Sequence, residues 1–450
     1  EKAIESIKTF ARRVCPDKIN EEGAALRETA SPESLGRWEA IAAGTLTLAA
    51  DQQADMPILR LTLLDFIADF ANWDNSIAPA YLETARALTQ AAHEALGGAP
   101  GTRPLVVDPF AGGGSIPLEA LRVGADAFAS DLNPVAVLLN KVVLEYVPRF
   151  GKRLADAVKK WGEWIKQEAE RELAQFYPKD PDGRTPIAYL WARTINCEGP
   201  GCGAEVPLLR SLLLAKRGVT STFFELITDK KSKKVEFRIR EGKANETEGT
   251  IRKGSATCPL CGFTTPNSRV RAQLTERFGG AASARLIGVV TIKGSELGRS
   301  YRTATDADIT AAIAAANELS RRADLNPDPI ALVPNEEIPT ARPSPNARGL
   351  SAVTRMGVST FGQLFTPRQA LTLSTFARLI SQVGQQVDFD VSGEFRDAVQ
   401  TVLAFGLDRL VDRSSTLCRW DPTPTASGII NTFSRQALPI LWDFAEGTPF

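Results

Sequence analysis

The sequence predicts an α/β fold with a cysteine-rich insert and additional helical segments. Three observations predict it. A short apolar run at residues 105–107 precedes three consecutive glycines and a helix start, a second short run at 127–130 ends on a carboxylate, and two tight cysteine pairs follow. At 450 residues the chain exceeds one ordinary domain, and its 43% hydrophobic and 24% charged residues are typical of a globular protein.

The first strand is expected at residues 105–107, because this apolar run is too short for a helix and contains β-branched residues. Since the run is continuously apolar, we expect the strand to be buried. Asp108 and Pro109 end it. After the glycines, Ser115 is a good helix N-cap and Pro117 falls in the first turn, where a missing N–H costs little. A strand, glycine turn and helix let a ligand approach bare backbone.

The second strand ends at Asp131, about 20 residues past the first turn, where nucleotide-binding α/β units place a carboxylate against ribose hydroxyls. A dinucleotide fingerprint would need a small residue at position 117, which is proline. A P-loop would need a lysine after the glycines, and none follows. A tight turn in an unrelated α/β sheet remains the structural alternative.

The two cysteine pairs predict a structural zinc site. Each pair offers two thiolates from a tight turn, and four thiolates without histidine leave no open position for catalysis. Glycine follows the second cysteine of each pair, at Gly203 and Gly262. The alternative is two separate pairs of reduced thiols. The predicted metal ligands are Cys197, Cys202, Cys258 and Cys261.

The remaining chain divides by composition and periodicity into five expected segments. These are a helical N-terminal segment at 1–56, a ligand-binding α/β part at 57–180, a zinc-ribbon insert at 181–300, a helix and Pro-rich linker at 301–349, and a helical segment at 350–450. We expect helices at 79–96, 134–143, 152–176, 306–322 and 395–411, a helix opened by Thr366 and Pro367, and strands at 220–227, 235–240 and 285–292.

Charge and composition limit the compartment and the partners. The 53 basic and 53 acidic residues cancel, so any nucleic-acid surface must be local. The basic turn at 230–234 is one candidate for such a surface, although a solvated hairpin tip is the commoner explanation of such a turn. Arg413, Arg419 and Arg435 near Trp420 are a second candidate, and an interdomain contact would explain these arginines equally well. No apolar run predicts a membrane span, and the tight cysteine pairs fit a reducing cytoplasm.

The segment Asp108-Pro109-Phe110-Ala111-Gly112-Gly113-Gly114 resembles the S-adenosylmethionine motif of amino-methylating DNA methyltransferases. The order of features resembles the adenine-specific DNA methylases that contain a zinc-ribbon domain. Further matches are Asn72-Trp73-Asp74-Asn75, Asp131-Leu132-Asn133-Pro134, the cysteine pairs, Phe365-Thr366-Pro367-Arg368-Gln369 and residues 433–444. Members of that family usually space the first two cysteines more tightly than Cys197 and Cys202.

The resemblance implies a Rossmann-like methyltransferase fold in which Asp108 holds the amino-acid end of the cofactor and Asp131 its ribose. The cofactor-binding set that it implies is Asp108, Pro109, Phe110, Ala111, Gly112, Gly114, Asp131, Leu132 and Asn133. The implied activity is methyl transfer to adenine N6 in double-stranded DNA, with the target base flipped out. Restriction or phage-defence proteins are further partners that the resemblance implies.

The sequence departs from this family in one respect, because no Pro-Pro dipeptide occurs anywhere in it. The family's Pro-Pro-aromatic catalytic tetrapeptide is expected beyond Phe450, so we predict a fragment that is inactive alone and assign no catalytic residue. Two alternatives stay open. One is a non-catalytic zinc-ribbon module that binds nucleic acid on a degenerate α/β scaffold, and the other is a nicotinamide oxidoreductase, which Pro117 disfavours.

Overall fold

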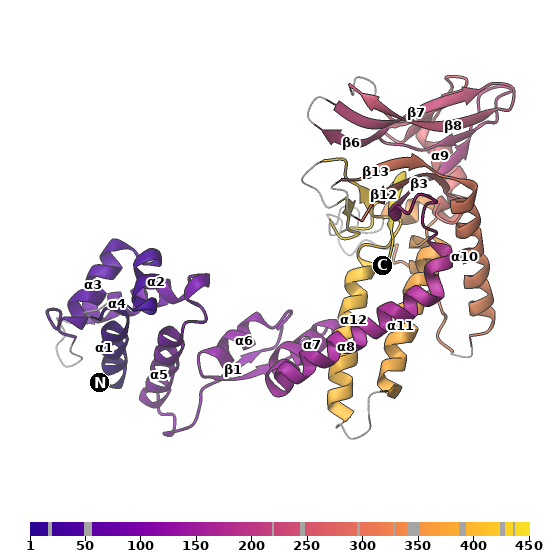
Figure 1. Cartoon of the computed structure of the whole chain (residues 1–450). Coiled ribbons are helices and arrows are strands. Elements are labelled where there is room, and N and C mark those ends of the chain that lie inside the picture. The colour runs from indigo at the N-terminus through magenta and orange to yellow at the C-terminus, as the bar shows by residue number, and fades with distance from the viewer. Residues whose placement is uncertain are drawn as a thin grey trace. The chain divides into compact units, whose positions relative to one another are not determined.

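The computed structural model describes residues 1–16, 20–48, 56–217, 220–243, 248–294, 298–326, 329–340, 352–386, 393–423, 428–434 and 437–450. These residues form two compact units, Glu1–Leu154 and Ala155–Phe450 (Figure 1). The architecture is mixed α/β, as predicted. The finer division into five segments stays a prediction. Within the described ranges, no helix is both long and apolar enough to cross a membrane.

The first unit begins with helices that share one apolar core. Phe10 lies at its centre and meets Trp38, Phe66 and Tyr81 edge-to-face, with ring centroids 5.1, 5.1 and 4.8 Å away. Asn20 and Ser31 cap the second and third helices with their side chains. The elements are α1 (Lys2–Val14), α2 (Glu21–Thr29), α3 (Pro32–Ala42), α4 (Met56–Phe70), η1 (Trp73–Asn75) and α5 (Pro79–Ala95).

The α/β part of this unit contains the predicted strand, glycine turn and helix. β1 (Leu105–Asp108) pairs in parallel with β2 (Asp126–Ala129), and α6 (Ser115–Arg122) connects them. Gly114, with φ +81°, occupies the N-cap position, and Ser115 is the first helical residue rather than the predicted cap. The chain continues through α7 (Pro134–Asn140), η2 (Lys141–Tyr146) and α8 (Val147–Leu173), which crosses into the second unit.

The prediction that the first strand is buried is wrong. Leu105 and Val107 are 63% and 57% exposed, and Phe128 on β2 is 57% exposed. These side chains alternate along their strands and therefore lie on one face of the sheet. Among the described residues this sheet consists of β1 and β2 alone, and no other element covers the face that carries these side chains. The apolar sequence had predicted that this face would be covered.

The second unit is built around a four-stranded sheet in the order β13-β12-β3-β16. β3 (Thr185–Ala192) lies between β12 (Arg285–Ile292) and β16 (Asp443–Gly447), antiparallel to both, and β13 (Ser300–Thr303) follows at one edge. A second antiparallel sheet holds β6 (Leu213–Arg217), β7 (Thr220–Asp229) and β8 (Lys234–Gly242), the predicted extended hairpin (Figure 1). The strands expected at 220–227, 235–240 and 285–292 are confirmed.

Helices and short strands complete this unit, and the expected helices at 306–322 and 395–411 are confirmed. Thr366 Oγ1 accepts the Gln369 N–H at 3.1 Å and Gln369 Oε1 accepts the Thr366 N–H at 2.9 Å, a capping box at the predicted start of α11. The remaining elements are η3 (Ala174–Phe176), β4 (Thr194–Asn196), β5 (Glu205–Pro207), β9 (Ile251–Arg252), β10 (Ser255–Thr257), β11 (Thr264–Thr265), α9 (Asn267–Thr275), η4 (Phe278–Gly280), α10 (Asp306–Asp324), η5 (Ala352–Met356), η6 (Phe361–Leu364), α11 (Pro367–Gln386), α12 (Gly393–Val411), β14 (Arg419–Trp420) and β15 (Ile429–Ile430).

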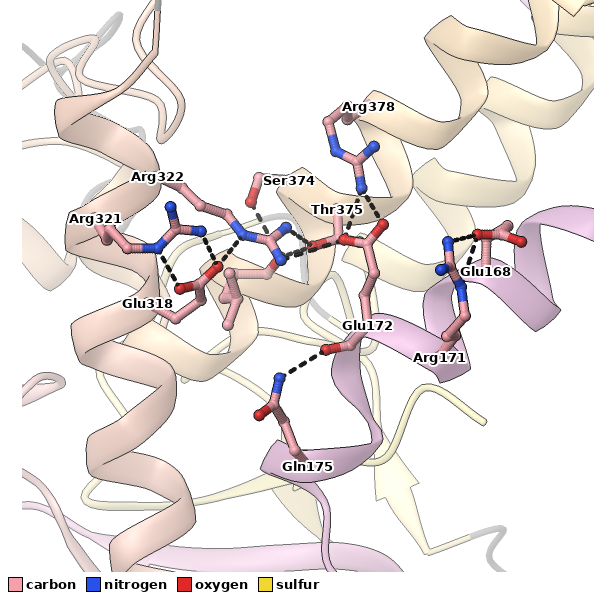
Figure 2. Close-up of polar contacts among 11 residues, drawn as sticks. Glu168, Arg171, Glu172, Gln175, Glu318, Arg321, Arg322, Ser374, Thr375 and Arg378 are labelled. Carbon is pink, nitrogen blue, oxygen red and sulfur yellow. Dashed lines mark hydrogen bonds and ion pairs between the residues drawn. The ribbon is translucent and has the colours of Figure 1, made fainter.

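An ion-pair network joins α8, α10 and α11 (Figure 2). Glu172 on α8 accepts from Arg322 on α10 at 3.2 Å and from Arg378 on α11 at 2.6 Å. Glu318 on α10 accepts from Arg321 and Arg322, each at 2.7 Å. Because Arg322 contacts both carboxylates, the two clusters form one network, which fixes the spacing of the three helices.

Arg193 holds separate parts of the second unit together without an acidic partner among the described residues. It is fully buried, and its guanidinium donates to Leu441 O at 2.7 Å, to Thr416 Oγ1 at 3.0 Å and to Gly279 O. Burial lowers the pKa of Arg193 to about 9. The carbonyl and hydroxyl oxygens replace the hydration that this cation loses.

Candidate functional site

The glycine turn lies at the carboxyl ends of β1 and β2, where backbone bonds join the two loops. Ser130 N–H donates to Asp108 O and Ala111 N–H donates to Ser130 O, each at 3.0 Å. The Asp131 side chain also joins the two loops, because its Oδ2 accepts the Gly112 N–H and its Oδ1 accepts the Asn133 N–H, both at 2.8 Å. The structure therefore brings the two predicted acidic loops together.

These bonds set the charge at the turn. The backbone N–H groups of Asn133 and Gly112 lower the pKa of Asp131, so the carboxylate is ionised at neutral pH. Each oxygen has a further lone pair that can accept a hydroxyl hydrogen. Asp108 makes a smaller turn of its own, in which Oδ1 accepts the Phe110 N–H at 3.1 Å.

The turn is open rather than sealed. A methyl group built on Gly112 or Gly113 would meet no atom of the described residues within 4 Å, apart from its own chain neighbours. Gly112 has φ +52°, a left-handed conformation that favours glycine, whereas Gly113 does not. Neither the backbone conformation nor the packing of the described residues therefore requires glycine at position 113. The need to leave space for a ligand is one physical reason for a glycine there.

Asn140 on α7 supports the turn from behind, and the sequence analysis did not single it out. Its Nδ2 donates to Gly112 O at 2.9 Å and to Ala136 O at 2.8 Å. Its buried Oδ1 has no hydrogen-bond partner among the described residues and would lie 2.6 Å from a Cβ on Gly114. A polar residue at the end of the apolar run Val135 to Leu139 is the sequence signal that could have identified it.

The other predicted cofactor residues surround this turn. Phe110 and Leu132 are 83% and 97% exposed, so both apolar side chains project from the loops. Asn133 caps α7, because its Oδ1 accepts the Val135 N–H at 3.0 Å. Pro109 is exposed and Ala111 is buried beneath the turn.

The four predicted metal ligands converge. The sulfur atoms of Cys197, Cys202, Cys258 and Cys261 all lie within 4.8 Å of one another. The Sγ atoms of Cys197 and Cys261 are 3.5 Å apart, and those of Cys202 and Cys258 are 3.9 Å apart. Zinc–sulfur bonds of about 2.3 Å in a tetrahedron would place the sulfurs about 3.8 Å apart, so the set fits a tetrahedral ion.

Each knuckle is shaped by its glycine. Gly203 and Gly262 have φ +66° and +75°, the left-handed conformation that lets the chain turn back after the second cysteine. In the first knuckle, the Gly199 N–H donates to Cys197 Sγ at 3.3 Å, although four residues separate Cys197 from Cys202. This spacing does not prevent the sulfurs from meeting.

Without a metal, the thiols of Cys197 and Cys261 have different pKa values. Burial raises the pKa of Cys197 to about 12, whereas the Phe263 N–H lowers the pKa of exposed Cys261 to about 7. A divalent cation would remove this inequality by holding all four as thiolates. Apolar side chains, among them Ile195, Val206 and Leu274, pack around the cluster, as expected for a structural site.

The basic hairpin beside the knuckles is partly neutralised. Lys233 donates to Gly201 O at 2.8 Å, which ties the tip of the hairpin to the first knuckle. Glu225 pairs with Arg240 at 2.9 Å and with Arg238 at 3.8 Å. Of the second basic candidate set, Arg413 and Arg419 are exposed, whereas Arg435 lies outside the described residues.

Comparison of the whole chain with protein-family models, with curated proteins and with solved structures found no match.

Proposed function

We propose that the chain binds S-adenosylmethionine at the glycine turn and is the cofactor-binding, zinc-holding part of a DNA methyltransferase that acts on adenine N6. One observation carries this proposal. A bare glycine turn and an ionised Asp131 meet at the carboxyl ends of two adjacent parallel strands, and the space above Gly112 and Gly113 is open. A Rossmann-like methyltransferase fold is part of the same proposal.

The residues present fit this cofactor. Asp131 keeps acceptor positions for the ribose hydroxyls while its backbone bonds hold it in place. Asp108 would receive the amino-acid end, and the exposed rings and chains of Phe110 and Leu132 offer apolar surface to the purine. The cofactor, when bound, supplies a methyl group on a sulfonium centre. The chain's own residues bind and orient it.

The acceptor in this proposal is a base amine in double-stranded DNA, flipped out of the helix. We assign no catalytic residue within the chain. The four thiolates would hold zinc in a structural role, because no open ligand position remains for substrate. Cytoplasmic location and association with restriction or phage-defence proteins belong to the same proposal.

Binding can be tested by thermal unfolding with and without S-adenosylhomocysteine. We expect a rise in the melting temperature of the wild type. Gly113→Ala should leave the unliganded melting temperature unchanged or slightly higher, since its methyl group meets open space and alanine restricts the unfolded chain, but it should reduce the ligand-induced rise. Gly294→Ala is the matched control, because that position is equally open and lies in the other unit.

A second variant addresses the ribose contact. Asp131→Asn removes the charge, keeps one acceptor oxygen for the backbone, and should weaken ligand binding by about tenfold or more. Coincident melts with and without ligand for a folded wild type would refute the cofactor site. Salt-sensitive DNA binding without ligand binding would instead favour the non-catalytic nucleic-acid module, and a preference for NAD would favour the oxidoreductase.

A further inference from the structure

A cavity of about 440 Å³ lies in the second unit, beside β14 and β16. Its volume falls in the range of small-molecule sites. Its apolar wall includes Leu190, Leu214 and Phe224 from strands of the two larger sheets. Leu209, Trp420 and Trp442 complete it from segments outside those sheets. The cavity lies wholly within residues 155–450 and shares no residue with the glycine turn.

Trp420 in this wall is fixed in place. Its Nε1–H donates to Leu214 O at 2.7 Å, and its ring meets Tyr301 edge-to-face with centroids 6.2 Å apart. An indole held in this way offers an aromatic surface at little entropic cost on binding. Trp442 supplies a second indole to the same cavity.

Polar groups of both charges line the same cavity. Arg210 and Arg419 have exposed side chains that make no hydrogen bond or ion pair to other described residues, although the charge of Arg210 acts on Asp443 and that of Arg419 on Asp421. Asp443 Oδ1 accepts the Arg210 N–H at 2.9 Å, and the carboxylate keeps further acceptor positions. Burial raises the pKa of Asp443, so a ligand that donates hydrogen bonds to it would relieve its desolvation.

We propose that this cavity binds a nucleotide, with its base against Trp420 and Trp442 and its phosphate at Arg210 and Arg419. Aromatic side chains bind bases through their faces, and free guanidinium groups bind phosphate with paired hydrogen bonds. Asp443 accepts hydrogen bonds, so it favours a base that carries an exocyclic amine. The nucleotide could be free or part of a single strand, since both present the same base and phosphate.

The test is a titration of the full chain with AMP, UMP and adenosine, followed by tryptophan fluorescence and calorimetry. We expect AMP to bind about tenfold or more tightly than UMP, which lacks the amine, and than adenosine, which lacks the phosphate. Arg419→Ala should weaken AMP binding by about tenfold while leaving adenosine binding unchanged. Arg396→Ala, which removes a partly exposed arginine on α12 outside the cavity, is the control and should change neither.

Two further arms complete the test. Asp443→Asn should reduce the preference for AMP over UMP, and circular dichroism would verify that this variant folds. A short single-stranded oligonucleotide that binds more tightly than AMP assigns the site to nucleic acid, and equal or weaker binding assigns it to the free nucleotide. Absence of binding by all ligands at millimolar concentration, or an Arg419→Ala variant that binds AMP like the wild type, overturns the proposal. Neither result bears on the S-adenosylhomocysteine melts.

Discussion

Arg368 and Glu446 form an ion pair inside the second unit, with Nε and Oε1 2.7 Å apart and both side chains at most 1% exposed. Arg368 also donates to Phe176 O at 3.0 Å, and its guanidinium lies 3.9 Å from the ring centre of Tyr189. The pair joins the first turn of α11 to β16, the last strand of the central sheet. This one buried ion pair therefore holds together α11 and β16, which are far apart in the sequence.

Glu446→Gln should strongly destabilise the second unit, because it leaves the Arg368 cation buried without a counter-charge. We expect a loss of about 3–5 kcal/mol in the free energy of unfolding. Urea denaturation would measure it, with the exposed Glu241→Gln as the control. A loss below about 1 kcal/mol would show that the neighbouring aromatic rings alone hold the cation.

The four-cysteine cluster should contain about one zinc ion per chain. Cys258→Ser should abolish stoichiometric zinc and lower the melting temperature of the second unit, because the surrounding apolar side chains pack on the cluster. Elemental analysis and melts with a chelator would measure both effects. Cys15→Ser, a change in the first unit outside the cluster, should alter neither. A reduced, folded wild type without metal would disprove the site.

The network in Figure 2 should lose stability in acid. Arg321, followed by Arg322, lowers the pKa of Glu318 to about 2. Because the pKa of Glu318 is lower in the folded than in the unfolded chain, its ionised carboxylate stabilises the fold at any pH above the unfolded pKa of about 4.5. That stabilisation is lost as the pH falls from about 4.5 through the folded pKa of about 2. Glu318→Gln should cost about 0.5–1 kcal/mol at pH 7 and only a small fraction of that at pH 2. Equal losses at both pH values would contradict this.

Asn140→Ala should loosen the glycine turn, because Gly112 O loses its side-chain donor. We expect a loss of about 1–2 kcal/mol and faster hydrogen exchange at the amides of residues 112–114. Glu145→Ala, an exposed change on the following helical turn, is the control. Unchanged exchange in the Asn140 variant would show that Asp131 holds the turn alone.

Phe278 adopts φ +51°, a left-handed conformation that is unfavourable for an aromatic residue, and its side chain is 60% exposed. Phe278→Gly should therefore stabilise the chain by about 0.5–1 kcal/mol, since strain is relieved and little burial is lost. Phe433→Gly, at a similarly exposed position without a positive φ, should not stabilise it. A destabilised Phe278 variant would mean that the ring makes contacts stronger than the strain.

The sequence predicted several helix starts and tight turns correctly. Pro79, Pro134 and Pro367 each begin a helix, and Thr366 caps the last of these as expected. The convergence of the cysteine knuckles was also predictable, because cysteines in tight turns with a following glycine have few other arrangements. Such signals lie within a few residues and need no knowledge of distant contacts.

Features that depend on distant partners were not predictable. The continuous apolar run at 105–107 predicted a buried strand, but burial depends on other elements that cover the strand, and the described residues supply no such cover for Leu105 and Val107. Residues 350–450 were expected to be helical, yet they also supply β16 to the central sheet. Asn140 and the buried Arg368–Glu446 pair likewise acquire their roles only through tertiary contacts.

The pairing of β3 with β16 has a consequence for protein synthesis. Arg193, just after β3, bonds to Leu441, just before β16, and these residues are 248 positions apart along the chain. At about 5–20 residues per second, a ribosome needs roughly 10–50 s to supply the missing strand after β3 has emerged. During that interval the nascent chain presents an open strand edge, which is a binding surface for chaperones and a starting point for aggregation.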